Sequence, residues 1–516
     1  MLLLKRVKYS IIFVTVTLKK GLSFMRASGI LMHISSLPGK YGIGKLGREA
    51  YAFADFLKAA KQKYWQILPV SPTSYGDSPY QSFSCYAGNP YFIDFETLEQ
   101  QGYLKADDYK HINWGKDPEK VDYSKLYENV FDVLRIAFES FIKQPESEFY
   151  DFINQNGWVR DYALFMALKF AHDGNPWYEW EEPLKMFWHD AIEGARWQYG
   201  HEIDFWCFVQ YKYYEQWNKL KSYVNSLGIE IIGDIPIYVA YDSVEVWSSP
   251  QNFLLDDKKT PIDVAGCPPD AFTALGQLWG NPLYRWDLHE REGFYWWIDR
   301  IRHATRVYDV VRIDHFRGFE SYYAIPFGRE DATVGEWRKG PDIRLFEEVK
   351  RQLGDIKIIA EDLGFITNEV ADLLRASGFP GMKVLEFAFD PYGKSSYLPH
   401  NYPSHNSVCY TGTHDNDTIL GWTKNASKEE VKFCREYLGV RSNRDVVWGM
   451  IRLAWASVSD TAIAQMQDFL ELGSEARMNT PSTLGGNWQW RCKENASDDT
   501  LAEKIGRLTE IYDRQN

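Results

Sequence analysis

Short apolar runs alternate with longer amphipathic stretches along most of this 516-residue chain. The apolar runs are rich in Val and Ile, which favour strands, whereas the amphipathic stretches repeat their apolar residues at helical spacing. The candidate strands are 29–34, 66–70, 230–235, 309–313, 357–360, 383–389 and 407–410, and the candidate helices include 49–60, 345–353, 368–376 and 428–438. Strand-then-helix alternation predicts parallel strands joined by helices. The expected fold class is therefore α/β, a (β/α)8 TIM barrel with large helical and loop insertions.

Two long segments interrupt this alternation and are expected to be insertions in one barrel. Residues 98–226 are dense in Trp, Tyr and acidic residues at helical spacing, which predicts a helical insertion. Residues 248–287 contain several prolines and glycines and are interpreted as an active-site loop insertion, because a long loop in a compact protein is usually functional. Neither a repeat nor a proline-rich linker divides the sequence, so residues 25–516 are expected to form a single catalytic barrel.

Residues 1–24 are expected to be an N-terminal extension outside the fold. Three basic residues near the start precede an apolar run, 9–18, which superficially resembles a secretion signal. That run is too short to span a bilayer. Lys19-Lys20-Gly21 follows it in place of a small-residue cleavage site. The first convincing strand pattern begins only after Met25.

Charge and cysteine content exclude several classes of function. The formal net charge of −13 repels polyanions, so neither nucleic acid nor a membrane surface is an expected partner. The six cysteines show no metal-ligand spacing and are interpreted as reduced thiols of a cytoplasmic enzyme. No cofactor and no bound metal are expected. Aromatic residues make up 16% of the chain, and their flat faces suit stacking against sugar rings.

Acidic side chains follow three of the predicted strands at the point where each strand ends. Asp314 ends the strand that carries Arg312, Glu361 ends a second strand, and His414 and Asp415 follow a third. Each acid alone is more often a loop residue or a helix N-cap than a catalyst. The C-terminal rim of a parallel barrel gathers strand ends into one pocket, so the three acids together predict an active site.

Two of these acids suit the opposite roles of a retaining glycosidic mechanism, in which one carboxyl group attacks the anomeric carbon and the other protonates the leaving oxygen. Arg312 shares a strand face with Asp314, and its charge is expected to lower the pKa of Asp314 and keep it ionised. Glu361 must keep its proton, which a desolvated site beside another anion would arrange. Asp415 is expected to accept hydrogen bonds from sugar hydroxyls, with His414 as a neighbouring donor.

These motifs resemble those of the amylomaltases, or 4-α-glucanotransferases, the disproportionating enzymes related to the α-amylase superfamily. The resemblance runs from about Met25 to the C-terminus, and besides the three acidic segments it covers residues 29–39, 77–82, 233–239, 276–282, 473–481 and 487–491. It implies that Asp314 is the nucleophile, Glu361 the general acid/base and Asp415 the transition-state stabiliser. It also implies a set of substrate-binding residues: Tyr80, Asp234, Gln277, Trp279, Arg312 and His414.

The function implied by this resemblance is transfer of an α-1,4-glucan segment to the 4-hydroxyl of another glucan or of glucose, in maltooligosaccharide, starch or glycogen metabolism. Donor and acceptor oligosaccharides are the expected partners. The acids alone fit a retaining α-glucan hydrolase equally well, and the resemblance alone favours transfer. A metal-dependent barrel hydrolase would need paired histidines, whereas His33, His315 and His414 are isolated in the sequence. A noncatalytic glycan-binding module would leave the three acids without a role.

Overall fold

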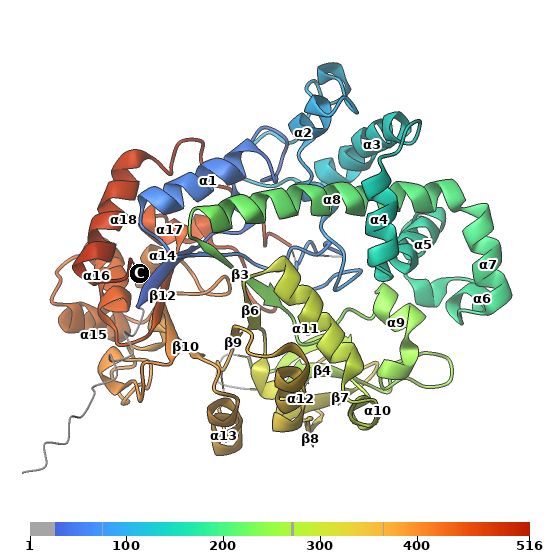
Figure 1. Ribbon diagram of the computed structural model, residues 1–516. Coiled ribbons are helices and arrows are strands. Elements are labelled where there is room, and N and C mark those ends of the chain that lie inside the picture. The colour runs from blue at the N-terminus through green and yellow to red at the C-terminus, as the bar shows by residue number, and fades with distance from the viewer. Residues whose placement is uncertain (1–25, 75, 270–272, 365, 484, 516) are drawn as a thin grey trace, which may run out of the picture.

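Eight parallel strands form the core of the computed structural model, which describes residues 26–515 apart from 75, 270–272, 365 and 484 (Figure 1). Their order is β10-β11-β12-β1-β2-β3-β6-β9. The bounds are β1 (Ala27–Leu31), β2 (Tyr64–Gln66), β3 (Glu230–Ile235), β6 (Val310–Ile313), β9 (Ile358–Ala360), β10 (Gly381–Val384), β11 (Ser407–Tyr410) and β12 (Thr461–Gln465). The Ala360 N–H donates to the Pro380 carbonyl oxygen, 3.0 Å away, so the two outer strands meet in a nearly closed barrel. The structure confirms the predicted TIM-barrel class. The expected extension 1–24 lies outside the described residues.

The barrel strands differ from the predicted ones mainly at their ends and in one omission. The structure has β2 at 64–66, where the sequence predicts a strand at 66–70, and β10 ends at Val384, before the end predicted at 389. The sequence pattern missed β12, whose residues read Thr-Ala-Ile-Ala-Gln. Alanine has a weak preference for strands. Burial inside the barrel, and not intrinsic preference, therefore makes this segment a strand.

Helices surround the barrel, and some begin and end at clear sequence signals. Ser427 caps the N-terminus of helix α15: its hydroxyl accepts from the Glu430 N–H, and the Glu430 carboxylate accepts from the Ser427 N–H. The helix ends at Gly439, which has φ 68°. The helices outside the long insertion are α1 (Arg48–Ala59), α2 (Phe95–Gln100), α9 (Val244–Ser248), α10 (Trp286–Arg291), α11 (Tyr295–Val307), α12 (Ile343–Leu353), α13 (Asn368–Ser377), α14 (Ile419–Asn425), α15 (Lys428–Leu438), α16 (Asn443–Ala456), α17 (Met466–Phe469) and α18 (Asp499–Ile511).

The segment between β2 and β3 is largely helical and uses many of the aromatic residues for its own core. Besides α2, its helices are α3 (Tyr123–Phe141), α4 (Ser147–Gln155), α5 (Trp158–Ala171), α6 (Glu182–Lys185), α7 (His189–Gln198) and α8 (Gly200–Ser226). Helix α8 runs beside α1 on the outside of the barrel, and α4 to α7 lie at the end of α8 that is remote from the strands (Figure 1). Phe138, Phe205 and Trp206 are fully buried or nearly so and pack edge to face. Among the described residues, no helix has both the length and the apolar character needed to cross a membrane.

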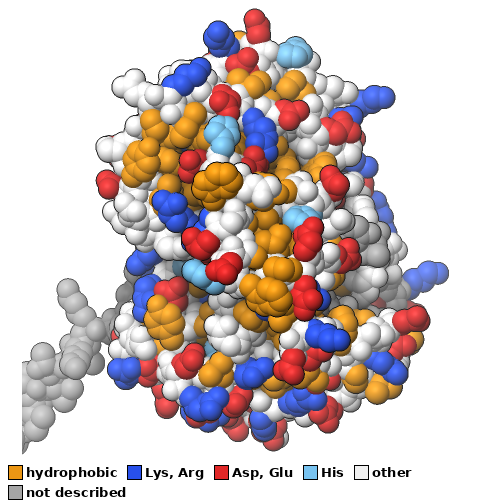
Figure 2. Space-filling model, turned by 90° about the vertical axis from the view of Figure 1, so that its right-hand side faces the viewer, with side chains coloured by type: hydrophobic (Ala, Val, Ile, Leu, Met, Phe, Trp, Pro, Cys, Tyr) orange, Lys and Arg blue, Asp and Glu red, His pale blue; other side chains and the backbone are white. Residues whose placement is uncertain are grey.

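Figure 2 looks onto the side of the molecule on which α6 and α7 lie in Figure 1. Acidic and basic side chains are interspersed there with separate apolar groups. Trp188 and Trp197, at the two ends of α7, are exposed by 53% and 89%. The negative net charge is thus spread over this face and not gathered into one patch.

Residues 248–287, interpreted from the sequence as a loop, contain two strands of a second sheet. Its order is β5-β4-β7-β8, and all its pairs are antiparallel. The strands are β4 (Asp263–Cys267), β5 (Gln277–Pro282), β7 (Ser321–Pro326) and β8 (Glu336–Lys339). Proline is compatible with this arrangement because Pro261 precedes β4 and Pro282 ends β5. The sheet gives Gln277 and Trp279 a fixed place on β5.

Arg514 ties the C-terminus to the N-terminal end of the barrel. Its guanidinium is fully buried and donates to the carbonyl oxygens of Ala27, Trp455, Ser457 and Ser459 at 2.7–3.0 Å. Replacing it removes four hydrogen bonds to carbonyl oxygens. Arg26 still donates to those of Trp455 and Ser457, but the loss of the buried guanidinium is strongly destabilising.

We expect Arg514→Leu to lower the free energy of unfolding by about 3–5 kcal/mol in denaturant titration. Arg507→Leu, on the exposed side of α18, serves as the control because that side chain is 71% exposed and pairs only with Glu510. It should change the unfolding free energy by no more than about 0.5 kcal/mol. Equal losses in the two variants would contradict this role of Arg514.

Candidate active site

The C-terminal ends of β3, β6 and β9 bring four charged side chains together. In the parallel pairing of β3 with β6, Asp234 lies opposite Arg312. Strand β9 pairs with the other edge of β6 and ends at Ala360. Asp314 and Glu361 directly follow β6 and β9, so these two carboxyl groups end neighbouring strands at the barrel rim. Gly233 on β3 lets the Tyr308 ring pack against the strand, because a β-carbon at position 233 would lie 2.1 Å from that ring.

Arg312 bridges a buried carboxylate and a more exposed one. Its Nη1 lies 2.5 Å from Asp234 Oδ2 and 3.0 Å from Asp314 Oδ1. The Arg312 and Asp234 side chains are 4% and 1% exposed, whereas that of Asp314 is 30% exposed. Asp234 Oδ1 is buried and has no hydrogen-bond partner in the protein. Of the two acids that bind Arg312, Asp314 is therefore the one open to attack a substrate.

The environments of Asp314 and Glu361 separate their pKa values. Burial raises the pKa of Asp314 to about 6, with Arg312 opposing the rise. The expected net lowering of this pKa is wrong, because desolvation outweighs a guanidinium whose charge Asp314 shares with Asp234. Burial and, second, the charge of Asp314 raise the pKa of Glu361 to about 8. Near neutral pH the pair therefore consists of an ionised Asp314 and a protonated Glu361, as the two roles require.

Backbone N–H groups hold both oxygens of the Glu361 carboxyl group. The His315 N–H donates to Oε2 at 2.7 Å, and the Leu363 N–H donates to Oε1 at 2.8 Å. These bonds favour the ionised form but are smaller in effect than burial. The carboxyl group is therefore oriented by the main chain of two neighbouring strand ends.

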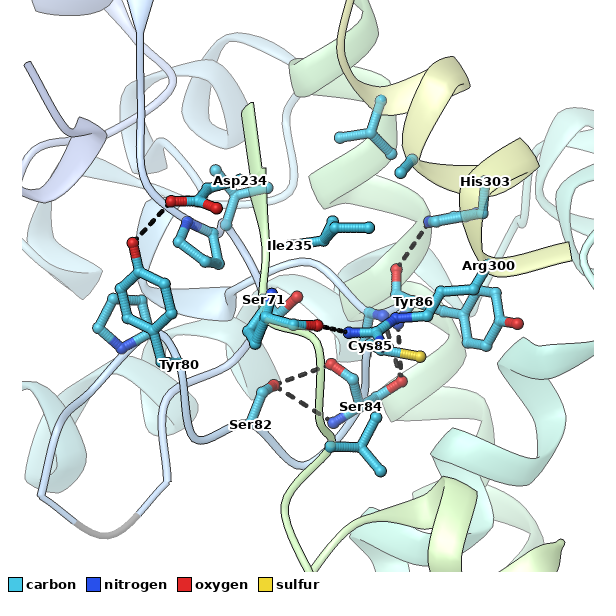
Figure 3. A pocket seen from close by; sticks show the side chains of 18 of the residues that line it. Ser71, Tyr80, Ser82, Ser84, Cys85, Tyr86, Asp234, Ile235, Arg300 and His303 are labelled. Carbon is cyan, nitrogen blue, oxygen red and sulfur yellow. Dashed lines mark hydrogen bonds between the residues drawn. The ribbon is translucent and has the colours of Figure 1, made fainter. Parts of the chain in front are cut away.

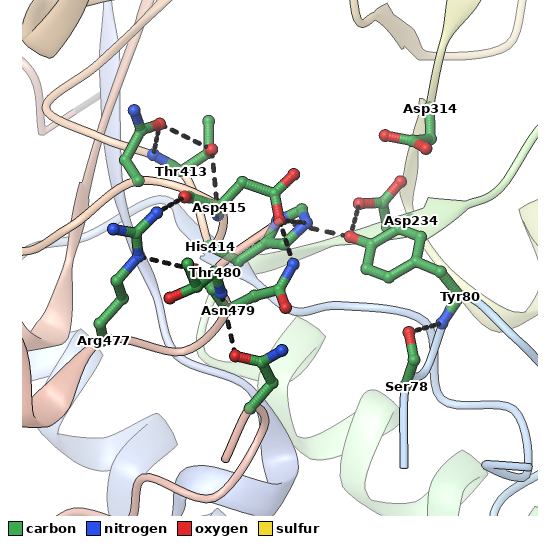
Figure 4. Close-up of polar contacts among 12 residues, drawn as sticks. Ser78, Tyr80, Asp234, Asp314, Thr413, His414, Asp415, Arg477, Asn479 and Thr480 are labelled. Atoms are coloured by element: carbon green, nitrogen blue, oxygen red, sulfur yellow. Dashed lines mark hydrogen bonds and ion pairs between the residues drawn. The ribbon is translucent and has the colours of Figure 1, made fainter. Parts of the chain in front are cut away.

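Tyr80, His414 and Asp415 form a second group of polar side chains near Asp234 and Asp314 (Figure 4). The rings of Tyr80 and His414 stack with centroids 4.9 Å apart and planes 17° apart. The Tyr80 hydroxyl donates to Asp234 Oδ2 at 2.7 Å and lies 3.4 Å from His414 Nδ1. His414 Nε2 is 3.4 Å from Asp415 Oδ1. Tyr80 thus connects the two groups, which come from strand ends far apart in the sequence.

Arg477 and Asn479, near the C-terminus, hold Asp415 in place, and neither was among the predicted site residues. Asn479 Nδ2 donates to Asp415 Oδ1 at 2.6 Å, and Arg477 donates to the Asp415 carbonyl oxygen at 2.6 Å. The Trp488 ring lies 5.9 Å from that of Tyr80. The signal for these residues was the family resemblance of 473–481 and 487–491, because no strand end precedes them to suggest a site.

Strand β5 places Gln277 and Trp279 beside the nucleophile candidate. The Trp279 ring meets the ring of His315, the residue after Asp314, edge to face with centroids 4.8 Å apart. The Trp279 indole N–H donates to Gln277 Oε1 at 3.1 Å. Both side chains remain partly exposed. Trp279 therefore contacts the residue that follows Asp314.

A cavity lies beside the segment that carries Tyr80, and Tyr80 and Asp234 are among the residues that line it (Figure 3). Its lining includes residues 69–71, 79–80, 82 and 84–87, together with residues from the end of β3 and from helix α11. Asp314, Glu361 and Asp415 do not line it. Glu245 accepts from the Ser84 hydroxyl and the Cys85 N–H, while Arg300 donates to the Pro236 carbonyl. The contacts of Glu245, on α9, hold the segment that carries Tyr80, and Arg300, on α11, holds the residue after β3. Among the described residues, no three His, Cys, Asp or Glu side chains gather as ligands for a metal ion.

The fold and site define a barrel enzyme of the glycosidic-bond class, with two carboxyl groups of opposite protonation at adjacent strand ends. A family model for 4-alpha-glucanotransferase matches residues 32–497, and the chain belongs to this family. It is 50% identical over 486 residues to the 4-alpha-glucanotransferase of Clostridium butyricum, which covers 94% of this chain and 100% of that relative. It is 48% identical over 500 residues to the Thermus thermophilus enzyme, with coverages of 95% and 99%.

Solved structures agree with this family assignment. An amylomaltase from Streptococcus agalactiae, in complex with acarbose, is 45% identical with a TM-score of 0.93, covering 95% of this chain and 100% of that one. The amylomaltase of Corynebacterium glutamicum, 19% identical with a TM-score of 0.72 and coverages of 95% and 75%, shares the fold. Family membership confirms the predicted transferase function over the hydrolase that the acids alone allowed.

Proposed function

We propose that the chain transfers α-1,4-glucan segments by double displacement, with Asp314 as nucleophile, Glu361 as general acid/base and Asp415 as transition-state stabiliser. Asp314 attacks the anomeric carbon, the bond to the departing glucan breaks, and Glu361 gives its proton to the leaving oxygen. Glu361 then takes the proton of the acceptor 4-hydroxyl, whose oxygen displaces the ester of Asp314. Two inversions at one carbon retain its configuration.

The observation that carries this proposal is the opposite setting of two adjacent carboxyl groups. Asp314 contacts a guanidinium and keeps 30% of its side chain exposed. Glu361 forms no ion pair with the described residues and accepts from backbone N–H groups beside the charge of Asp314. A retaining mechanism needs one ionised and one protonated carboxyl group, and these environments supply both.

The remaining predicted residues are proposed to bind the sugar chain. Tyr80 and His414 would present a stacked aromatic surface and polar atoms to the sugar at the point of cleavage. Asp234 Oδ1, which has no hydrogen-bond partner among the described residues, would accept from a sugar hydroxyl. Arg312 would stabilise the anionic nucleophile, while Gln277 and Trp279 would border neighbouring sugars. Asn479 is added to this set because it orients Asp415.

The pKa values of the pair predict a bell-shaped pH dependence of kcat/KM. Activity should rise as Asp314 ionises, with an apparent pKa of about 6, and fall as Glu361 loses its proton, with an apparent pKa of about 8. Both values belong to the interacting pair. Initial rates measured from pH 4 to 10 check this, and a rate that keeps rising through pH 9 would exclude Glu361 as the acid.

Incubation with maltotriose tests the proposed substrates and reaction. The expected products are glucose together with a ladder of longer oligosaccharides, because the glucan held on Asp314 passes to a sugar hydroxyl. Release of glucose and maltose without elongation would refute transfer to glucans. The proposed partners are therefore α-1,4-glucan donors and acceptors from maltooligosaccharide, starch or glycogen metabolism.

We propose a cytoplasmic location on the basis of the cysteines. Free thiols are present at positions 85, 207, 409, 434 and 492. Reduced thiols are typical of the cytoplasm.

A further inference from the structure

His315, the residue after Asp314, adopts a left-handed backbone conformation with φ 52° and ψ 48°. This conformation is uncommon for a residue with a β-carbon and costs about 1–2 kcal/mol. Strained residues of this kind cluster at active sites, where the surrounding contacts hold them. Here the His315 carbonyl oxygen accepts from the Gly318 N–H at 2.9 Å, which closes the turn after β6.

The turn lets one residue contact two parts of the active site. The His315 N–H donates to Glu361 Oε2 at 2.7 Å. The His315 ring meets the Trp279 ring edge to face, with centroids 4.8 Å apart and planes 87° apart. His315 is thus in contact both with the proposed acid/base and with the strand proposed to border the sugars.

We infer that His315 is a positioning residue, which fixes the carboxyl group of Glu361 through its backbone N–H and joins it to Trp279 on β5 through its ring. The inference rests on the proposed function, in which Glu361 transfers the proton. Each oxygen of Glu361 accepts one backbone bond and keeps a second lone pair, so the carboxyl group can still meet the glycosidic oxygen. Contact between the sugar and β5 is therefore coupled to the orientation of the acid.

Two substitutions separate the backbone role from the ring. His315→Gly removes the ring and readily keeps the left-handed turn, whereas His315→Val also removes the ring but disfavours that turn. Burial, and then Arg317, lower the pKa of the His315 ring to about 3. The ring is uncharged near neutral pH, so neither change alters the charges that face Glu361, which come from Asp314 and Arg312.

The backbone bond predicts different pH profiles for the two variants. Loss of the N–H donor destabilises the ionised form of Glu361, so the basic limb of kcat/KM should move upward by about one pH unit in His315→Val. In His315→Gly the limb should stay in place, while KM for maltotriose rises several-fold because Trp279 loses its neighbour. Circular dichroism and thermal unfolding confirm that the variants are folded. If His315→Val does not fold, His315→Ala, with its milder backbone preference, replaces it.

An activated donor distinguishes positioning of the acid from general damage. An α-maltosyl fluoride carries a leaving group that needs little protonation, and azide attacks the glycosyl ester without a base. With both present, His315→Val should lose only a few-fold in release of fluoride, against about 10²-fold with maltotriose. Equal losses with both donors, or identical pH profiles in the Gly and Val variants, would overturn the inference. Glu361→Gln measured alongside tests the proposed function separately: if that variant also loses fluoride release in the presence of azide, the proposed acid/base role is itself wrong.

Discussion

Asp314→Asn is expected to lower turnover of maltotriose by about 10⁴-fold or more, because an amide cannot form the glycosyl ester. The substitution keeps the shape of the side chain. Arg312 retains its shorter contact, with Asp234 at 2.5 Å, so no buried charge is left without a partner. The enzyme should therefore stay folded and still bind oligosaccharides, which isothermal titration with an unreactive glucan would show.

The matched control for this variant is Asp355→Asn. Asp355 lies between α12 and β9, before the N-terminal end of β9 and so at the opposite end of the barrel from Asp314, and its side chain is 90% exposed. Its charge contacts only Lys350, so turnover should remain within a factor of two of the unmodified enzyme. A substantial residual rate in Asp314→Asn, measured after excluding deamidation by mass spectrometry, would assign the nucleophile elsewhere.

Glu361→Gln is expected to lower kcat/KM for maltotriose by about 10²–10⁴-fold, because the amide neither gives nor takes the required proton. Two rescue experiments identify this role. An α-maltosyl fluoride needs little protonation to leave, and azide needs no deprotonation to attack, so the two together should restore turnover and yield an α-maltosyl azide. The α configuration of that azide would show that both displacements still occur.

The pH profile gives a second signature of the same substitution. The basic limb near the pKa of Glu361, about 8 in the unmodified enzyme, should disappear in Glu361→Gln. The acidic limb should stay near pH 6, because Glu361 is protonated and uncharged in that range, so its replacement by glutamine removes no charge that acts on Asp314. If the variant keeps its basic limb, or if azide gives no product, another group performs proton transfer.

Local patterns in the sequence were sufficient to predict the parts of the site that depend on one strand. The spacing of Arg312 and Asp314 places both on one strand face, and their 3.0 Å contact follows from it. Strand-end acids predict a shared rim because barrel topology gathers strand ends. The contact of Tyr80 with Asp234 joins residues 154 positions apart and depends on the whole fold, so the sequence did not predict it. The family resemblance implied only that both residues bind the sugar.

Other features lay beyond sequence reasoning because they depend on burial and on partners that tertiary structure supplies. Arg312 was expected to dominate the pKa of Asp314, but its charge is shared with Asp234 and desolvation has the larger effect. Strand β12 contains two alanines and becomes a strand only through its neighbours β1 and β11. Asn479 follows no strand, so nothing in its local sequence indicates that it holds Asp415.

Capture of the covalent intermediate tests the central claim most directly. A 5-fluoro-α-glucosyl fluoride destabilises the charged transition state, while its good leaving group still allows the first displacement, so the glycosyl ester should accumulate. Proteolysis and tandem mass spectrometry then locate the sugar. The account predicts an ester on Asp314, formed in the unmodified enzyme and absent from Asp314→Asn. A sugar on Glu361 or Asp415, or turnover that continues with no ester on Asp314, would contradict it.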